Sequence, residues 1–287
     1  MSCDVSVVLP AYNSSATLQR ALDSVYGQSL LPRDIIVVDD GSNDWEQSRR
    51  IAASCPSNVP IRFIHEAKNR GPSTARNIGV AAARGHYLAF LDSDDVWCPH
   101  KLAIQYGVMA RSQLDFSVHD YAQDLKSRRC DGDESPGGGP RRPSSKVASL
   151  VSSRISSSIS CWSLLVRNFA TPTVMVVRPK MVLFDTSLQR CEDWKCWMEL
   201  LSQRDCRGAH IGCVLAGGFK RSLGVSGLSQ DVKAMHASKM RALTRLLKEN
   251  TISPVQYLVG VGLETVKYPV RVLRVRMSLP QCTAAPR

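Results

Sequence analysis

The sequence lacks any apolar run long enough to cross a membrane. A transmembrane helix needs about 20 consecutive, mostly apolar residues, and no such stretch occurs in the 287-residue chain. The first apolar run has no basic segment before it and ends at Pro10, which is not the pattern of a secretory signal peptide. We therefore expect neither a transmembrane helix nor a signal peptide.

Closely spaced cysteine pairs are also missing. The ten cysteines form no C-x-x-C pair and no regular framework. A chain of this length, 44% hydrophobic, can bury enough apolar surface to fold without covalent cross-links. Because disulfides are rare in the reducing cytosol, this cysteine usage predicts reduced thiols in a cytoplasmic protein.

Aromatic residues are few, at 6% of the chain. The 37 Lys and Arg against 25 Asp and Glu give a formal charge of +12, which favours an anionic partner such as a phosphorylated ligand, a membrane surface or nucleic acid. Nucleic-acid surfaces combine clustered basic residues with aromatic stacking platforms. Here the basic residues are dispersed, so we expect no nucleic-acid partner.

Short apolar runs alternate with amphipathic segments through the first hundred residues. This alternation predicts an α/β fold with a doubly wound, mostly parallel central sheet flanked by helices and right-handed crossovers. Gly85 is expected to close the third helix at its C′ position. The predicted strands are 5–9, 35–38, 61–64 and 88–91, and the predicted helices are 15–28, 45–53, 71–83 and 99–112.

Polar residues directly follow three of these strands. Pro10, Ala11 and Tyr12 follow the first, Asp39 and Asp40 the second, and three aspartates at 92, 94 and 95 the fourth. In doubly wound sheets ligands bind outside the carboxyl ends of the strands, so these side chains should converge on one crevice.

The aspartates after the fourth strand have the spacing of a cation site. Neighbouring carboxylates repel each other unless a cation or solvent relieves them. Asp-x-Asp spacing allows Asp92 and Asp94 to reach one hard divalent ion such as Mn²⁺ or Mg²⁺. The alternative is a solvated acidic turn that caps the next helix.

The second half of the chain is less regular. Residues 125–160 are dominated by Gly, Pro, Ser and Arg, which predicts a flexible surface loop; a lid or acceptor-specific insertion is the alternative. A strand is expected at 174–177, and a helix that begins at 191–194. Near the C-terminus, Ser253 and Pro254 start a predicted helix that Pro269 should interrupt.

Five segments together resemble a known family. VVLPAYN, VDDGSND, NRGPSTARNIG, FLDSDD and CEDWKCWMELL are similar, in order and approximate spacing, to motifs of the inverting family-2 glycosyltransferases of the GT-A fold, over about residues 4–230. The resemblance implies a GT-A domain at 1–230 and a C-terminal helical extension at 231–287. Within the domain it implies a nucleotide-sugar-binding half at 1–118 and an acceptor and catalytic-base half at 161–230.

The resemblance also implies a role for each motif residue. Asp94, with Asp92, would bind the metal ion, and Asp193 would be the base that takes the proton of the acceptor hydroxyl. Asp40 is favoured over Asp39 to accept the imide N–H of uracil or thymine. The full predicted nucleotide-sugar site is Pro10, Ala11, Tyr12, Asp39, Asp40, Arg76, Asp92 and Ser93.

Purely structural roles remain as alternatives for several of these residues. The Asp39-Asp40 pair also fits an Asp-Gly turn, Arg76 also fits a solvated helix position, and Glu192 with Asp193 would favour a helix N-terminus through the dipole. The chain also departs from the family pattern: many relatives have a His in a basic-aromatic loop, where residues 219–222 are Phe-Lys-Arg-Ser. Lys220 or Arg221 would have to replace it.

The predicted function is an inverting, metal-dependent glycosyltransferase. It would move a sugar from a UDP or dTDP sugar to a saccharide or lipid-linked acceptor in cell-envelope polysaccharide or glycolipid assembly. One alternative is a same-fold nucleotidyltransferase, which is disfavoured because no Gly-rich loop with Arg and Lys follows the first strand. Another is a nonenzymatic module that binds nucleotide sugars or nucleic acid.

The C-terminal helix suggests peripheral membrane contact from the cytoplasmic side. Val255, Leu258, Val259, Leu263 and Val266 fall on one helical face, and Lys267, Arg271, Arg274 and Arg276 follow. Each basic residue near an anionic membrane contributes about 1 kcal/mol. The alternative is that this apolar face packs on the protein core and the cations are solvated.

Overall fold

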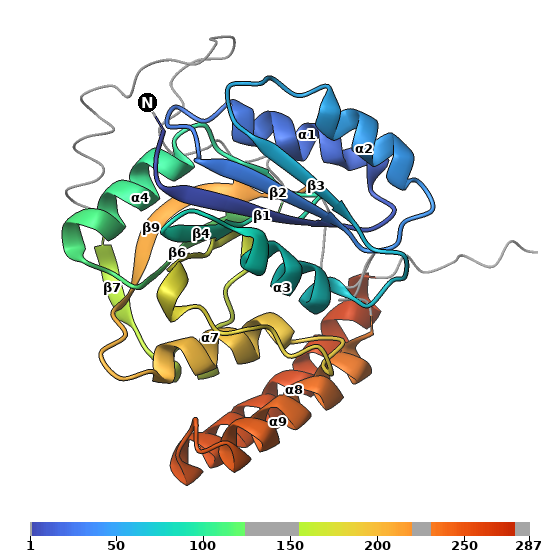
Figure 1. Ribbon diagram of the computed structural model, residues 1–287. Helices are drawn as coiled ribbons and strands as arrows, with labels where there is room; N and C mark the ends of the chain where they lie inside the picture. Colours follow the sequence, from blue (N-terminus) through green and yellow to red (C-terminus); the bar gives the residue numbers. More distant parts are fainter. Residues whose placement is uncertain (1, 124–154, 220–230, 279–287) are drawn as a thin grey trace, which may run out of the picture.

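The computed structural model describes residues 2–123, 155–219 and 231–278. The first half alternates strands and helices as predicted (Figure 1). The elements are β1 (Val5–Ala11), α1 (Ser15–Tyr26), β2 (Asp34–Asp39), α2 (Trp45–Ala53), β3 (Ile61–His65), α3 (Pro72–Ala82), β4 (Tyr87–Phe90), β5 (Val96–Trp97), α4 (Lys101–Ser112) and β6 (Phe116–Ala122). The three central strands β1, β2 and β4 are short, mostly apolar runs that are buried on both faces, which is typical of a parallel sheet covered by helices.

The second half completes the sheet and adds two long helices. Its elements are β7 (Ile155–Ile159), α6 (Cys161–Val166), the 3₁₀ helices Thr171–Thr173 and Arg178–Lys180, β8 (Met175–Val177), α7 (Glu192–Ser202), β9 (Gly208–Gly217), α8 (Val232–Lys248) and α9 (Pro254–Ser278). The predicted strand at 174–177 and the predicted helix at 191–194 are both present.

One sheet runs through the molecule in the order β3-β2-β1-β4-β8-β6-β9-β5, with β7 paired to β9. The β1–β2, β2–β3, β1–β4 and β6–β9 pairings are parallel and include most of the paired residues. The antiparallel pairings involve β5, β7 and β8. The predicted α/β fold with a mostly parallel central sheet is confirmed.

Helices cover both faces of the sheet. Alternate residues of β1 point to opposite sides, so Val7 packs with α1 and α4 in one core whereas Val8 packs with α3, α7 and α8 in the other. The carboxyl ends of β1, β2 and β4 lie together at one edge, because these strands are parallel neighbours. The predicted motif residues therefore meet at that edge.

Three sequence predictions on local structure are wrong. Residues 155–160 are not part of a loop: 155–159 form β7 against β9, and Ser160 caps α6. The remaining predicted loop residues, 125–154, lie outside the described residues. Gly85 is not the C′ residue of α3, whose C-cap is Ala83. It is needed because a Cβ there would lie 2.6 Å from the Ser6 backbone nitrogen.

The third error concerns α9, which runs through Pro269 instead of stopping there. A proline removes one backbone donor from a helix, but Pro269 is on the exposed side, where water can bond the orphaned carbonyl. An ion pair between Glu264 and Arg271 spans the proline. Side-chain contacts on the buried face thus keep the helix continuous.

The predicted apolar face of α9 lies mostly in solvent, which contradicts the alternative that it packs on the protein core. Val255, Leu258 and Val266 are 61%, 67% and 67% exposed, while Gly260 and Glu264 face the rest of the protein. Of the predicted face, Leu263 alone packs against the core. Figure 1 shows α8 and α9 side by side, below α7 in this view.

Two further sequence predictions can be compared with the described residues. Cys3, Cys55, Cys161, Cys191, Cys196 and Cys206 are reduced thiols, as predicted, whereas Cys98 is disulfide-bonded, contrary to the prediction. Within the described ranges, no helix combines the length and the apolar character that spanning a bilayer requires.

Candidate active site

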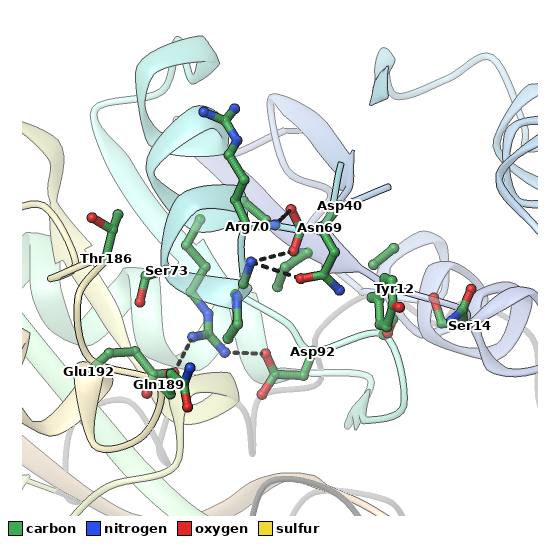
Figure 2. A pocket seen from close by; sticks show the side chains of 18 of the residues that line it. Tyr12, Ser14, Asp40, Asn69, Arg70, Ser73, Asp92, Thr186, Gln189 and Glu192 are labelled. Carbon is green, nitrogen blue, oxygen red and sulfur yellow. Dashed lines mark hydrogen bonds and ion pairs between the residues drawn. The ribbon is translucent and has the colours of Figure 1, made fainter. Parts of the chain in front are cut away.

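A cleft of about 950 Å³ lies at the carboxyl ends of β1, β2 and β4. Its walls come from these strand ends, from the start of α3 and from the segment that leads into α7; Figure 2 shows Asp40, Asp92 and Glu192 around it. The predicted residues that line it are Pro10, Ala11, Tyr12, Asp40, Arg76, Asp92, Ser93 and Asp94. Asp39 and Asp193, both in the described part of the chain, do not line it.

The two neighbouring aspartates after β2 have different surroundings. Asp40 is 3% exposed and accepts backbone N–H bonds from Arg70 (2.9 Å) and Gly71 (2.7 Å). Asp39 is fully buried and bonds Ser42 and His65. Asp40 therefore fixes the loop before α3 in the cleft wall, whereas Asp39 holds the turn behind it.

Arg76 links two motifs that are far apart in the sequence. It is 5% exposed, and it donates to Asp92 Oδ1 (2.8 Å) and to Glu192 Oε1 (3.0 Å). Although burial opposes its charge, the carboxylates of Asp92 and Glu192 raise the pKa of Arg76. The solvated-helix alternative for Arg76 is therefore wrong.

Glu192 is the acidic residue of α7 that reaches the cleft. Burial and the neighbouring Asp193 raise the pKa of Glu192 to about 7, against the opposing effect of Arg76. Cys191, which precedes it, has a left-handed backbone with φ 59°, a conformation that is unfavourable for residues with a Cβ. Several contacts are thus needed to hold this helix start.

Asp193 lies beside the cleft wall and is half-buried. Its Oδ1 accepts the Trp194 backbone N–H (2.6 Å), and its Oδ2 accepts from Asn168 Nδ2 (3.2 Å). Two acidic residues in the first turn of α7 also suit the helix dipole, so the structural alternative and the catalytic prediction are compatible.

The three aspartates after β4 make different contacts. Asp92 and Asp94 line the cleft, whereas Asp95 accepts from the Tyr121 hydroxyl (2.7 Å). The N-cap of α4 is His100, so none of the aspartates caps that helix. Arg20 donates to the Asp94 carbonyl (3.2 Å), and its guanidinium lies 4.0 Å from the centroid of the Phe219 ring.

The comparisons with known proteins agree with this geometry. Residues 6–129 match the model of the family described as "Glycosyl transferase family 2". This part of the chain belongs to glycosyltransferase family 2. The match ends before the segment that contains Glu192 and Asp193, so the family model covers the strand-end motifs and not α7.

Curated relatives are glycosyltransferases of greater length. The chain is 38% identical over 117 residues to an uncharacterized glycosyltransferase of Rickettsia felis, which is 41% of this chain and 19% of that protein. It is 32% identical over 117 residues to the Escherichia coli UDP-Glc:alpha-D-GlcNAc-diphosphoundecaprenol beta-1,3-glucosyltransferase WfgD (41% and 45%). It is 26% identical over 202 residues to the putative colanic acid biosynthesis glycosyl transferase WcaA of E. coli K12 (69% and 66%).

Solved structures share the fold at low identity. Staphylococcus aureus TarS 1–349 superposes with a TM-score of 0.65 at 16% identity, over 99% of this chain and 76% of that one. The mannosyltransferase PcManGT of Pyrobaculum calidifontis, solved with GDP-Man and Mn²⁺, gives a TM-score of 0.64 at 16% identity, over 100% and 77%. The fold of this chain is therefore of the GT-A type.

Among the cleft residues that were not predicted are Asn69, Arg70, Gln189 and Arg190. Two glycines in the sequence could have indicated that Asn69 and Arg70 lie at the site. Gly41 has φ 73°, and a Cβ there would lie 2.6 Å from the Asn69 backbone nitrogen; Gly71 has φ 91°. Both therefore require glycine, and together they indicate that the turn after β2 touches the loop before α3. Gln189 and Arg190 come from an irregular segment that gave no signal.

The oxygen ligands in the cleft fit a divalent cation that would complete its coordination shell with substrate oxygens. Among the described residues, no group of three or more His, Cys, Asp or Glu side chains forms a metal cage. The cleft instead offers the carboxylates of Asp92 and Asp94. Mg²⁺ and similar hard ions usually bind one or two protein carboxylates together with substrate phosphates and water. Lys220 and Arg221, the predicted substitutes for the missing His, lie outside the described residues.

Proposed function

We propose that the protein is an inverting, metal-dependent glycosyltransferase. Its donor is a nucleoside-diphosphate sugar, of UDP or dTDP type, and its acceptor is a saccharide or lipid-linked saccharide of cell-envelope polysaccharide or glycolipid synthesis. The observation that carries the proposal is the cleft itself: Asp40, Asp92 and Asp94 line it together, and Arg76 links Asp92 to Glu192 at the start of α7.

The donor binds along the strand ends in this proposal. Asp40 recognises the pyrimidine imide N–H, and Tyr12 and Pro10 line the pocket for the base. Arg70 and Arg190 lie in the same cleft and supply positive charge to the diphosphate. WfgD is named for UDP-Glc, and TarS has been solved with UDP-GlcNAc, which supports a UDP-type donor.

Asp94 and Asp92 would hold Mn²⁺ or Mg²⁺. When bound, the ion would supply charge neutralisation for the departing nucleoside diphosphate. Arg76 bonds Asp92 through Oδ1, which orients that carboxylate at the mouth of the cleft. The relative PcManGT was solved with Mn²⁺, and this supports the choice of metal.

Asp193 is the proposed base. Its carboxylate takes the proton of the acceptor hydroxyl while the acceptor oxygen bonds to the anomeric carbon and the bond from that carbon to the diphosphate oxygen breaks. A single in-line displacement inverts the anomeric configuration. Glu192, bonded to Arg76, holds the helix start against the donor side.

A nucleotide-sugar screen tests the proposal. Melting temperatures are measured with UDP, dTDP and GDP sugars, each with and without MnCl₂. A ligand that binds only the folded state raises the melting temperature, by about 5 °C or more at saturating concentrations. We expect this rise for UDP or dTDP sugars with Mn²⁺. A rise for GDP sugars alone would contradict the donor type, and no rise for any of them would contradict the donor site.

We also propose that α9 contacts an anionic membrane surface, where a lipid-linked acceptor is presented, on the cytoplasmic side. The support is an exposed apolar stripe: Val255, Leu258, Val266 and Leu273 are 61%, 67%, 67% and 57% exposed on one face of the helix. Amphipathic helices of this kind lie in the plane of the interface.

The predicted role of the basic residues near this stripe needs a correction. Lys267 donates to the carbonyls of Leu165 (3.2 Å) and Val166 (2.6 Å), and Arg271 pairs with Glu264. These two of the four predicted basic residues are engaged within the protein. Apolar contact, more than charge, therefore carries the proposed binding.

A further inference from the structure

The segment that leads into α7 lines one end of the cleft without regular structure of its own. Residues 181–191, all of them described, contain no helix or strand, and Thr186, Gln189 and Arg190 of this segment lie in the cleft wall. Backbone groups outside helices and strands need other partners. The position of this wall therefore depends on the contacts that the segment makes with neighbouring elements.

Helix α8 holds the segment through Arg245. The Arg245 Nη1 donates to Asp185 Oδ2 (2.6 Å) and to the Ser187 hydroxyl. Asp185 Oδ1 in turn accepts the Ser187 backbone N–H (3.0 Å), which closes a turn around Thr186. Although burial opposes it, the hydrogen bonds from Ser187 and Arg245 lower the pKa of Asp185 to about 2. The turn is therefore held by a charged pair at neutral pH.

Two further contacts fix the same segment. Lys195 of α7 is 4% exposed and makes an ion pair with Asp185 at 3.6 Å. Leu188 is buried in the core to which α7 and α8 contribute. Gln189 follows directly after it, is exposed and lines the cleft. The anchored residues therefore determine where the Gln189 amide stands.

The order of residues along the cleft matches the order of groups in a nucleoside-diphosphate sugar. Figure 2 shows Asp92 between Tyr12 on one side and Gln189 on the other. In the proposed function Tyr12 lines the pocket for the base, and Asp92 lies at the diphosphate. The sugar comes after the diphosphate in the ligand, so it reaches the end of the cleft that contains Gln189. A glutamine amide has two donors and one acceptor oxygen, which suit sugar hydroxyl groups.

We propose that Gln189 binds a hydroxyl group of the transferred sugar, and that Arg245 is the positioning residue that holds Gln189 there through the turn at Asp185 and Ser187. The inference rests on the proposed function and extends it, because it names the side chain that recognises the sugar. It also gives the C-terminal helices a part in donor binding, since Arg245 lies on α8.

The first experiment compares Gln189→Ala with Gln47→Ala, at an exposed position of α2. Nucleotide release is measured with Mn²⁺ and the nucleotide sugar that gives the largest melting shift in the screen. We expect KM for this donor to rise about tenfold in Gln189→Ala. Inhibition by the free nucleoside diphosphate, which lacks the sugar, should be unchanged, and Gln47→Ala should match the wild type. An unchanged KM, or an equal weakening of the free nucleotide, would overturn the proposal.

The second experiment tests the positioning role. Arg245→Met is compared with Arg241→Met, because Arg241 is exposed and bonds Ser238 of the same helix. Arg245→Met should raise KM for the donor about tenfold with kcat nearly unchanged, whereas a loss of folded protein would lower the apparent kcat. Equal KM values for the two variants would overturn the role.

A milder change keeps this test valid if Arg245→Met does not fold. Ser187→Ala removes one of the two groups that Arg245 contacts and leaves Asp185 in place. KM for the donor should then rise about threefold. A KM equal to that of the wild type would overturn the positioning role.

A double-mutant comparison separates this inference from the proposed function. If Arg245 acts through Gln189, then Arg245→Met should not raise KM further in the Gln189→Ala variant, and additive effects would overturn the inference. If the wild type releases no nucleotide from any nucleotide sugar, the proposed function is refuted. Release with the same KM in the wild type and in Gln189→Ala would refute this inference alone.

Discussion

On the donor side of the cleft, backbone amides hold the Asp40 carboxylate, whereas on the acceptor side a side chain from a distant helix holds the Glu192 carboxylate. Asp40 is fixed by the N–H groups of Arg70 and Gly71, within a unit of neighbouring strands. Glu192 is fixed by Arg76, which is 116 residues away in sequence. The donor side is thus built from local motifs, and the acceptor side depends on how the later helices pack.

Removing a metal ligand should give the largest effect on the donor side. Asp94→Ala removes one of the two proposed metal ligands, so we expect nucleotide release to fall by about 1000-fold and the Mn²⁺-dependent melting shift with UDP to vanish. The fold should persist, because the change also removes repulsion among the aspartates. Asp95→Asn, which keeps a group that can bond Tyr121, is the control and should stay near the wild type. Activity of Asp94→Ala in the presence of chelator would contradict the assignment.

Removing the proposed base probes the acceptor side. Asp193→Asn keeps the size of the side chain and removes its proton affinity, so kcat should fall by roughly 100-fold, with the UDP melting shift unchanged. Glu192→Gln serves as the comparison. If Glu192→Gln loses kcat and Asp193→Asn does not, then the base is the neighbouring residue, which does line the cleft.

A single methyl group added at Gly41 tests how tightly the turn after β2 packs against the loop before α3. Gly41→Ala forces a Cβ into the backbone at Lys68 and Asn69 at a positive φ, so the free energy of unfolding should fall by about 2 kcal/mol or more. Gly262→Ala in α9, where a Cβ meets nothing within 4 Å, is the matched control and should raise it by roughly 0.5–1 kcal/mol. Chemical denaturation measures both; equal effects would refute the tight turn.

The pH dependence of stability tests the contact between Glu192 and Arg76, which joins the donor and acceptor sides of the cleft. The pKa of Glu192 is raised to about 7 from its ordinary 4.5, so its contribution to stability is present below about pH 4.5 and is lost as pH rises through about 7. The unfolding free energy of the wild type should therefore fall relative to that of Glu192→Gln across this window, by on the order of 1 kcal/mol. A constant difference between the two proteins would show that Glu192 does not titrate there.

The smallest expected effect concerns α9. Leu258→Gln combined with Leu273→Gln removes apolar surface that is exposed in the fold, so binding to vesicles of anionic phospholipid should weaken by about tenfold while the melting temperature stays unchanged. Lys248→Gln, at an exposed position of α8, is the control and should bind nearly as the wild type. Vesicle co-sedimentation that is equal for all three proteins, or absent for the wild type, would contradict the membrane proposal.

The sequence predicted the donor side well, for a physical reason. Buried parallel strands are short apolar runs such as Ile35 to Val38, and their polar ends must meet at one sheet edge. The N-terminal strands and helices and the convergence of the motif residues follow from that rule, whereas the preference for Asp40 over Asp39 came from the family resemblance.

The errors lie where distant packing decides the structure. The segment Ile155–Ile159 is rich in serine, and it becomes a strand because β9 provides an edge to pair with. Pro269 does not end α9, because Glu264 and Arg271 pair across it. The alternative that the apolar side of α9 packs on the core is also wrong, because the side with Gly260 packs on Leu243 and Leu165. None of these contacts leaves a local pattern in the sequence.

The identity of the products tests the central claim most directly. The protein is incubated with Mn²⁺ and the donor chosen by the melting screen, and the phosphorus-containing products are identified by ³¹P NMR. The account predicts a nucleoside diphosphate, formed by the wild type and not by Asp94→Ala. With pyrophosphate added, conversion of the donor to a nucleoside triphosphate and a sugar 1-phosphate would indicate nucleotidyl transfer, and an unchanged donor would indicate a nonenzymatic binding module; either result would contradict glycosyl transfer.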